Sequence, residues 1–174
     1  ADVPGPGSGA TTQTGIAAPE CLIAEAALRR RKNTPVSHAA QNGTAIITAA
    51  GLFNACNRTN RALKEIKVVV NGAGAAAIAC TELIKAMGVP HDHVIMCDRK
   101  GVIYQGREGL DQWKSAHAAK TDRPPLEGAL KGADGLVGLS AAGPRPPARA
   151  LHLAPHPTRL PLPTPQPQTP PPHP

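Results

Sequence analysis

The spacing of apolar and charged residues predicts a helix from Glu20 to about Lys32. The segment is rich in strong helix formers. Its four basic residues, Arg29 to Lys32, stand at the C-terminal end, where the helix dipole favours positive charge. Pro19 suits the first helical turn, and Asn33-Thr34-Pro35 ends the helix. We interpret the basic run as a solvated helix end rather than as a phosphate-binding patch.

A second helix is predicted after Asn42-Gly43, and it extends to about Asn57. Apolar residues recur there at helical spacing and predict the apolar face of the helix. These residues are Ile46, Ala49, Ala50 and Phe53. The β-branched pair Ile46-Ile47 leaves a strand open as the alternative.

The pattern then changes to a strand, a glycine turn, a helix and a second strand. Val68-Val69-Val70 is a short β-branched run, and Asn71-Gly72-Ala73-Gly74 opens a helix that continues to Met87-Gly88. The sequence His93 to Asp98 reads as the second strand. Together these segments predict one βαβ unit.

Shorter elements are predicted further along the chain. They are a helix within Gly109 to Ala118, a short helix from Pro125 to Lys131, and a strand over Asp134 to Ser140 whose glycines weaken strand propensity. Residues 1–15 hold four glycines and two prolines without apolar periodicity, which predicts a disordered lead-in. The domain organisation expected is therefore a lead-in over 1–15, a folded domain over 16–143 and a tail over 144–174.

Composition limits the core and the tail of this chain. Only three aromatic residues occur among the 174, namely Phe53, Tyr104 and Trp113. The core must therefore consist of aliphatic side chains, and a large aromatic ligand cage is excluded. The last 31 residues hold 13 of the 20 prolines and no acid, so they are expected to be extended and polyproline-like.

Charge and cysteine usage exclude several classes of protein. The net charge of +7 falls to +4 before Pro144, and no basic stripe with stacking aromatics is present, so nucleic acid is not an expected partner. No stretch approaches the roughly 20 apolar residues of a membrane helix, and we expect a cytoplasmic protein that does not bind membranes.

The four cysteines are widely spaced and form no CxxC pair, which predicts free buried thiols rather than zinc ligands or disulfides. They are Cys21, Cys56, Cys80 and Cys97.

The segment Gly72 to Ala77 fits the G-x-G-x-x-G/A dinucleotide fingerprint, after a strand and at the start of a helix. Gly72 permits the tight turn, Gly74 lets the backbone approach a pyrophosphate, and the small Ala77 lets the helix pack on the strand. The helix N-terminus then offers N–H groups to the phosphates. Close packing in an Ala-rich turn is the alternative explanation of the pattern.

Asp98 stands 21 residues after Ala77 at the end of the second strand, where a carboxylate accepts hydrogen bonds from ribose hydroxyls. A surface carboxylate is the alternative. Arg99 and Lys100 follow and favour NADP over NAD without separating the two. The predicted cofactor-binding residues are Gly72, Ala73, Gly74, Ala75, Ala77 and Asp98. The loop Gly138 to Gly143 is either a contact for the nicotinamide or a plain turn.

From about Ile16 to Gly143 the chain resembles malic enzymes, particularly the bacterial NADP-dependent kind. Four segments carry the resemblance: Ile16 to Cys21, Pro35 to His38 together with Gln41 to Ala45, Val68 to Gly74, and Cys97 to Tyr104. The resemblance implies the nucleotide-binding domain of an enzyme that oxidises malate with NAD or NADP. Such an enzyme decarboxylates the product to pyruvate with the help of a divalent metal.

The chain departs from the family at the metal ligands. In the family, a Glu-Asp pair precedes the Ile of the Ile-x-x-Pro-Glu segment, and a third acidic ligand lies in the segment His-Asp-Asp-Gln-His-Gly-Thr-Ala. Thr14, Gly15 and Ala40 stand at those positions, with Ala39 beside the last. Mg²⁺ and Mn²⁺ need anionic oxygens, so we expect this chain to bind neither metal.

Catalytic residues are also not expected. The family's tyrosine acid and lysine base come from an N-terminal domain that this chain is expected to lack. Tyr104 and Lys100 lie in the nucleotide-binding segment and are not substitutes for them. The isolated chain is therefore predicted to be inactive towards malate, with dinucleotide binding as its remaining function.

These observations predict an incomplete Rossmann-type α/β domain, a doubly wound parallel sheet with a disordered Pro-rich tail. An incomplete sheet exposes edges and apolar helix faces, so partial unfolding or association into a homo-oligomer is expected. The alternative function is a non-catalytic nucleotide-binding or scaffold protein whose Pro144-x-x-Pro147-x-Arg149 motif recruits a partner. The abrupt ends of the resemblance favour a shifted reading frame as the origin of the tail.

Overall fold

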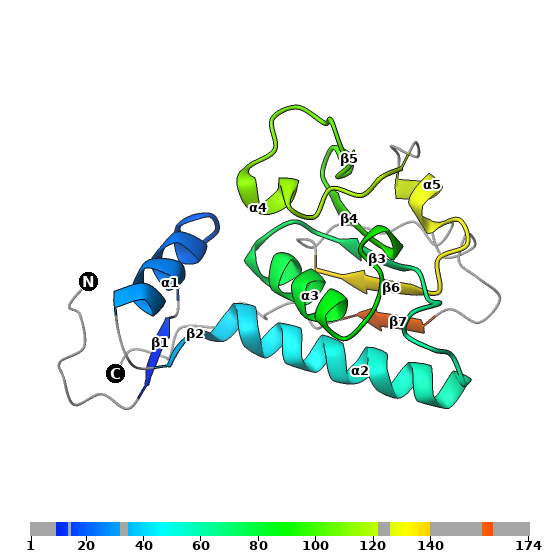
Figure 1. Ribbon diagram of the computed structural model, residues 1–174, viewed down its shortest axis with the longest axis horizontal. Coiled ribbons are helices and arrows are strands. Elements are labelled where there is room, and N and C mark those ends of the chain that lie inside the picture. The colour runs from blue at the N-terminus through cyan, green and yellow to red at the C-terminus, as the bar shows by residue number, and fades with distance from the viewer. Residues whose placement is uncertain (1–9, 14, 32–34, 122–125, 140–157, 162–174) are drawn as a thin grey trace, which may run out of the picture.

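The computed structural model describes residues 10–13, 15–31, 35–121, 126–139 and 158–161 (Figure 1). The elements in chain order are β1 (Thr11–Gln13), α1 (Glu20–Arg31), β2 (Val36–His38), the π-helical turn η1 (Ala39–Gly43), α2 (Thr44–Thr59), β3 (Val68–Asn71), α3 (Ala75–Ala86), the 3₁₀ turn η2 (His91–His93), β4 (Val94–Asp98), β5 (Gly101–Val102), α4 (Gln112–Ser115), α5 (Leu126–Leu130), β6 (Gly135–Gly138) and β7 (Thr158–Pro161). The predicted helices and the predicted βαβ unit, β3-α3-β4, are all present.

A five-stranded sheet organises the domain, with the strand order β5-β4-β3-β6-β7. The strands β4, β3, β6 and β7 are parallel to their neighbours, and only the two-residue β5 is antiparallel. In the register of the central strands, Asn71 of β3 lies opposite Cys97 of β4 and Gly138 of β6. The carboxyl ends of β3, β4 and β6 therefore meet at one edge of the sheet.

Helices cover both faces of this sheet, as the alternating side chains of β3 show. Val68 and Val70 lie in one core cluster with residues of α2 and α3, including Leu52. Val69 points to the other face and clusters with Leu130 of α5. The predicted doubly wound α/β architecture is confirmed, and α2 and α3 lie together on one side of the sheet (Figure 1).

The core is aliphatic, as the composition requires. Phe53 is 48% exposed, and Tyr104 and Trp113 are half-buried, so no aromatic side chain lies at its centre. All four cysteines are buried and none forms a disulfide, as predicted. Burial raises the pKa of the Cys56 and Cys80 thiols, which keeps these side chains protonated and apolar at neutral pH.

The helix α2 is confirmed, but its predicted apolar face is right only at Ala49 and wrong at Ile46, Ala50 and Phe53. Ile46 is 62% exposed and Phe53 is 48% exposed. The buried residues of α2 are Ala45, Thr48, Ala49, Leu52 and Cys56. Both stripes have helical spacing, and the stripe of smaller side chains is the one that packs against α3 and the sheet. The bulky residues Ile46 and Phe53 of the other stripe are exposed and do not belong to the core face.

Two segments expected to be disordered contain strands. Thr11–Gln13 forms β1, which pairs in parallel with β2 and places Gln13 opposite His38. Within the tail, the structure describes only Thr158–Pro161, which pairs with Gly135–Gly138 and covers the edge of β6. Both pairings join residues distant in sequence, and local composition carries no signal for them. The predictions for the rest of the tail lie outside the described residues.

Among the described residues, no helix is long and apolar enough to cross a membrane.

Candidate functional site

The predicted site residues come together at the carboxyl edge of the sheet. The chain leaves β3 through α3 to reach β4 on one side, and later returns to place β6 on the other side of β3. The Gly72 N–H donates to the Cys97 carbonyl at 2.8 Å, and the Leu139 N–H donates to the Asn71 carbonyl at 2.9 Å. These bonds join the ends of β3, β4 and β6 at a topological switch point, where ligands of open α/β sheets bind.

The glycine turn has the backbone geometry that its sequence predicts. Gly72 is buried with φ of 140°, a conformation that L side chains rarely adopt. Gly74 is the N-cap of α3, with φ of −86° and an extended ψ of −178°. It is exposed, and a Cβ added there would meet no atom within 4 Å. The space in front of Gly74 is therefore open to a ligand.

The first turn of α3 faces the same edge of the sheet. Ala77 is 1% exposed and belongs to the core cluster around β3, so its small side chain allows the close contact of helix and strand. Ala73 and Ala75 are half-buried, and the turn contains no acidic residue. The first N–H groups of a helix have no intrahelical acceptor, and with the helix dipole they attract an anion. This end of α3 suits a pyrophosphate.

Asp98 ends β4 next to the glycine turn, with its carboxylate held from two directions. Oδ1 accepts from the Lys100 N–H at 2.8 Å, while Nη2 of Arg107 lies 2.8 Å from Oδ1 and 2.7 Å from Oδ2. A carboxylate has about four acceptor positions, so these contacts leave one on Oδ2. The Asp98 side chain is 21% exposed, and the free acceptor suits a ribose hydroxyl.

Arg107 also belongs to this edge, and the sequence analysis did not predict it. Its side chain is only 10% exposed, and Nη1 donates to the carbonyl of Val102 at 2.8 Å. The chain reverses at Gly106, whose φ is 85°, and this turn brings Arg107 back to Asp98. A basic residue nine positions after an acid is too common a pattern to predict such a pair.

Two further basic residues make the site positive. Arg99 and Lys100 follow Asp98 and are exposed. Because Arg107 already neutralises Asp98, the charges of Arg99 and Lys100 are not cancelled by that carboxylate. Of the loop predicted to lie against the nicotinamide, the described residues include only Gly138 and Leu139.

The residues present do not fit a hard divalent cation. Thr14 lies outside the described residues, and Ala40 belongs to η1. The buried polar atoms without a partner in this region include no carboxylate oxygen; they are both ring nitrogens of His38 and the side-chain oxygens of Gln13 and Gln41. In the part of the chain that the structure describes, no three His, Cys, Asp or Glu side chains come together as a metal site. Mg²⁺ requires carboxylate ligands that this region does not supply.

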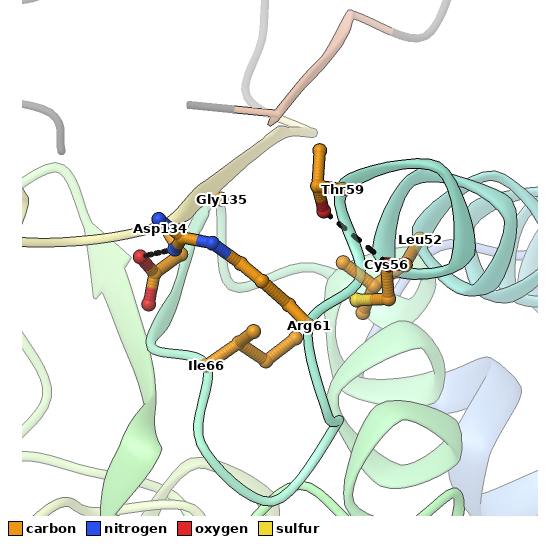
Figure 2. A pocket seen from close by; sticks show the side chains of 7 residues that line it. All are labelled: Leu52, Cys56, Thr59, Arg61, Ile66, Asp134 and Gly135. Atoms are coloured by element: carbon orange, nitrogen blue, oxygen red, sulfur yellow. Dashed lines mark hydrogen bonds and ion pairs between the residues drawn. The ribbon is translucent and has the colours of Figure 1, made fainter. Parts of the chain in front are cut away.

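A small cavity lies at the opposite, amino edge of the sheet, and its lining has a structural role. It has a volume of about 10 Å³, which is room for about one water. Figure 2 shows Arg61 reaching across it to Asp134, and the two side chains form an ion pair. Asp134 also accepts from the Lys67 N–H at 2.9 Å. These contacts join the end of α2 to the beginnings of β3 and β6.

Sequence comparisons find a family model and several relatives that match most of this chain. Residues 41–139 match the family model described as malic enzyme, NAD binding domain. The NADP-dependent malic enzyme of Rhizobium meliloti (strain 1021) is 57% identical over 140 residues, which is 80% of this chain and 18% of that protein. The probable NADP-dependent malic enzyme of Rickettsia prowazekii (strain Madrid E) is 52% identical over 74% of this chain and 17% of its own length. The chain thus spans less than a fifth of these relatives.

A solved structure gives the same result at the level of the fold. The NAD-dependent malic enzyme of Thermotoga maritima superposes with a TM-score of 0.79 and 31% sequence identity, covering 87% of this chain and 41% of that one. The family match includes the glycine turn, Asp98 and all of the central strands. On this evidence, the chain belongs to the malic enzyme NAD-binding domain family.

Proposed function

We propose that this chain binds NADP or NAD at the carboxyl edge of its sheet and is the nucleotide-binding part of a malate-oxidising, decarboxylating enzyme. The observation that carries the proposal is the open space at Gly74, at the N-terminus of α3, beside the partly free carboxylate of Asp98. The dinucleotide supplies the hydride acceptor when it is bound. The two relatives named as NADP-dependent malic enzymes match 80% and 74% of this chain, and this supports a part in malate oxidation.

The chain's own residues hold the dinucleotide at two places. The pyrophosphate lies against the backbone of Gly72 to Gly74, where the N-terminus of α3 offers N–H groups and partial positive charge. The adenosine ribose donates a hydroxyl hydrogen bond to Oδ2 of Asp98, the oxygen that keeps a free acceptor position. Arg107 fixes the direction of that acceptor by holding the carboxylate.

The charges around Asp98 favour NADP. An unpaired carboxylate repels a 2′-phosphate, but the ion pair with Arg107 removes most of that repulsion. The exposed side chains of Arg99 and Lys100 then attract the phosphate. The site accepts both dinucleotides and binds NADP more tightly at low ionic strength.

We infer that this chain alone does not turn over malate. Thr14, Gly15 and Ala40 stand where the family has acidic metal ligands, and the buried polar atoms without a partner on either side of Ala40 include no carboxylate oxygen. Without a divalent cation, nothing polarises the substrate carbonyl or stabilises the enolate that forms when carbon dioxide leaves. Manganese-dependent formation of NADPH from malate by the purified chain would contradict this inference.

Calorimetric titration of the purified chain with NADP⁺ and NAD⁺ tests the binding proposal. Asp98→Asn should weaken both dinucleotides by about tenfold, because a charge-assisted hydrogen bond becomes a neutral one. Glu65→Gln is the matched control, since it removes one exposed carboxylate at the amino edge of the sheet. Absence of binding at millimolar dinucleotide by the folded chain would overturn the proposal.

A further inference from the structure

A cluster of ionisable side chains lies at the other end of α3, away from the glycine turn. Lys85 occupies the last turn of the helix, and its Nζ lies 3.1 Å from Nδ1 of His91 and 3.2 Å from Nδ1 of His117. His91 comes from η2, and His117 follows α4. Two imidazoles from separate segments therefore contact one amine, and nothing in the proposed dinucleotide site uses this arrangement.

The contacts of each Nε2, the ring nitrogen that faces away from Lys85, bear on where the ring hydrogens lie. Nε2 of His91 lies 3.3 Å from the Ala118 carbonyl, and Nε2 of His117 lies 3.7 Å from Oε1 of Glu82. A carbonyl only accepts, so Nε2 of His91 bears a hydrogen and Nδ1 of the neutral ring presents a lone pair to Lys85. The neighbouring His117 lowers the pKa of Glu82.

Burial makes the Lys85 amine less basic than an ordinary lysine. Desolvation lowers its pKa from 10.5 to about 8, although the charges of Asp92 and Glu82 act in the opposite direction. The unprotonated fraction of the amine near neutral pH is therefore much larger than that of an ordinary lysine, although the ammonium form still predominates. The neighbouring His91 is exposed while His117 is buried, so the cluster faces solvent on the His91 side.

We propose that Lys85 is a site of covalent acylation by a small acyl phosphate. The Nζ lone pair attacks the carbonyl carbon, a C–N bond forms, and the bond from that carbon to the phosphate oxygen breaks, so that inorganic phosphate leaves with the bonding electrons. The amine proton passes to Nδ1 of His91 and then to water. No oxidant or reductant is required, and the product is an ε-N-acyl lysine.

The expected rate advantage follows from two opposing effects. At pH 7.4, a pKa of about 8 leaves about a fifth of the amine neutral. An ordinary lysine has about a thousandth in that form, a difference of roughly 200-fold. A Brønsted slope of about 0.5, as for thiolates, makes the less basic amine roughly 20-fold less nucleophilic. Lys85 should therefore react roughly tenfold faster than an exposed lysine.

The test uses acetyl phosphate and the whole chain, with acetylation at each lysine followed over time by peptide mass spectrometry. The exposed residues Lys64 and Lys131 are internal controls in the same sample. Lys85 should acetylate about tenfold faster than either control at pH 7.4. Its rate should level off above pH 8, while the rates of the controls continue to rise. A Lys85 rate equal to that of Lys64, or one that rises with pH in parallel with it, would overturn the proposal.

His91→Gln separates the imidazole's role from simple exposure. The variant should slow acetylation at Lys85 several-fold and leave the rate at Lys64 unchanged, because only the local proton acceptor is lost. Circular dichroism identifies an unfolded sample, in which all lysines react alike. An unchanged Lys85 rate in the folded variant would remove His91 from the mechanism and contradict the proposal in the form stated.

Discussion

Replacing Gly74 with alanine should weaken dinucleotide binding by at least tenfold without unfolding the domain. A methyl group at this position meets no atom within 4 Å, and φ of −86° is accessible to alanine. Alanine is a poorer N-cap than glycine, but it also loses less conformational entropy on folding, by about 0.4–1 kcal/mol. The two effects oppose each other, so the free energy of unfolding should change by less than about 1 kcal/mol.

The effect on binding should be much larger. The methyl group occupies the space through which the pyrophosphate approaches the N-terminus of α3. Losing one charge-assisted hydrogen bond from the backbone to the phosphate costs about 1.5–3 kcal/mol, or roughly 10- to 150-fold in Kd. Calorimetric titration with NADP⁺ measures the loss, and urea unfolding measures the stability of the same sample.

Gly43→Ala is the matched control. Gly43 is also an exposed helix N-cap, it has φ of −61°, and a Cβ there meets no atom within 4 Å. This variant should bind NADP⁺ as the original chain does. If Gly74→Ala binds within twofold of the original chain, or if both variants lose the same affinity, the placement of the pyrophosphate is refuted.

Three further predictions concern the turn, the ion pair and pH. Gly72→Ala should lower the free energy of unfolding by about 1–3 kcal/mol in urea titrations, because φ of 140° strains any L side chain; an unchanged midpoint would contradict the turn geometry. Arg107→Gln should shift the preference from NADP⁺ towards NAD⁺ several-fold, because Asp98 becomes an unpaired negative charge; an unchanged ratio of the two Kd values would count against this role. Lys85 has a lower pKa in the folded state, about 8 against 10.5, so the unfolded chain binds more protons between these values and stability rises with pH there. Lys85→Met should reduce that rise between pH 8 and 10, and an identical rise in both proteins would disprove the assignment.

The sequence predicts the local features of the site because each depends on neighbouring residues. Three β-branched residues, two glycines at fixed spacing and an alanine-rich helix specify the unit β3-α3-β4 with little help from the rest of the chain. Asp98 could be placed because it ends the strand that follows. Gly72 has the positive φ that its place after a strand suggests.

Features that depend on distant residues could not be predicted in this way. The ion pair of Arg107 and Asp98 requires the chain to reverse through β5 and Gly106, and no spacing rule encodes that turn. The pairing of β1 with β2 joins segments more than twenty residues apart. In α2, two stripes have the same period, and only the tertiary structure decides that Leu52 rather than Phe53 is buried.

The most direct test of the central claim is an NMR titration of the isotopically labelled chain with NADP⁺. Binding at the carboxyl edge of the sheet should shift the amide signals of Gly72, Gly74, Ala75 and Asp98. The signals of Arg61 and Asp134, at the opposite edge, should stay unchanged. Shifts that leave the glycine turn unaffected, or no shifts at millimolar NADP⁺, would contradict the claim that this edge binds the dinucleotide.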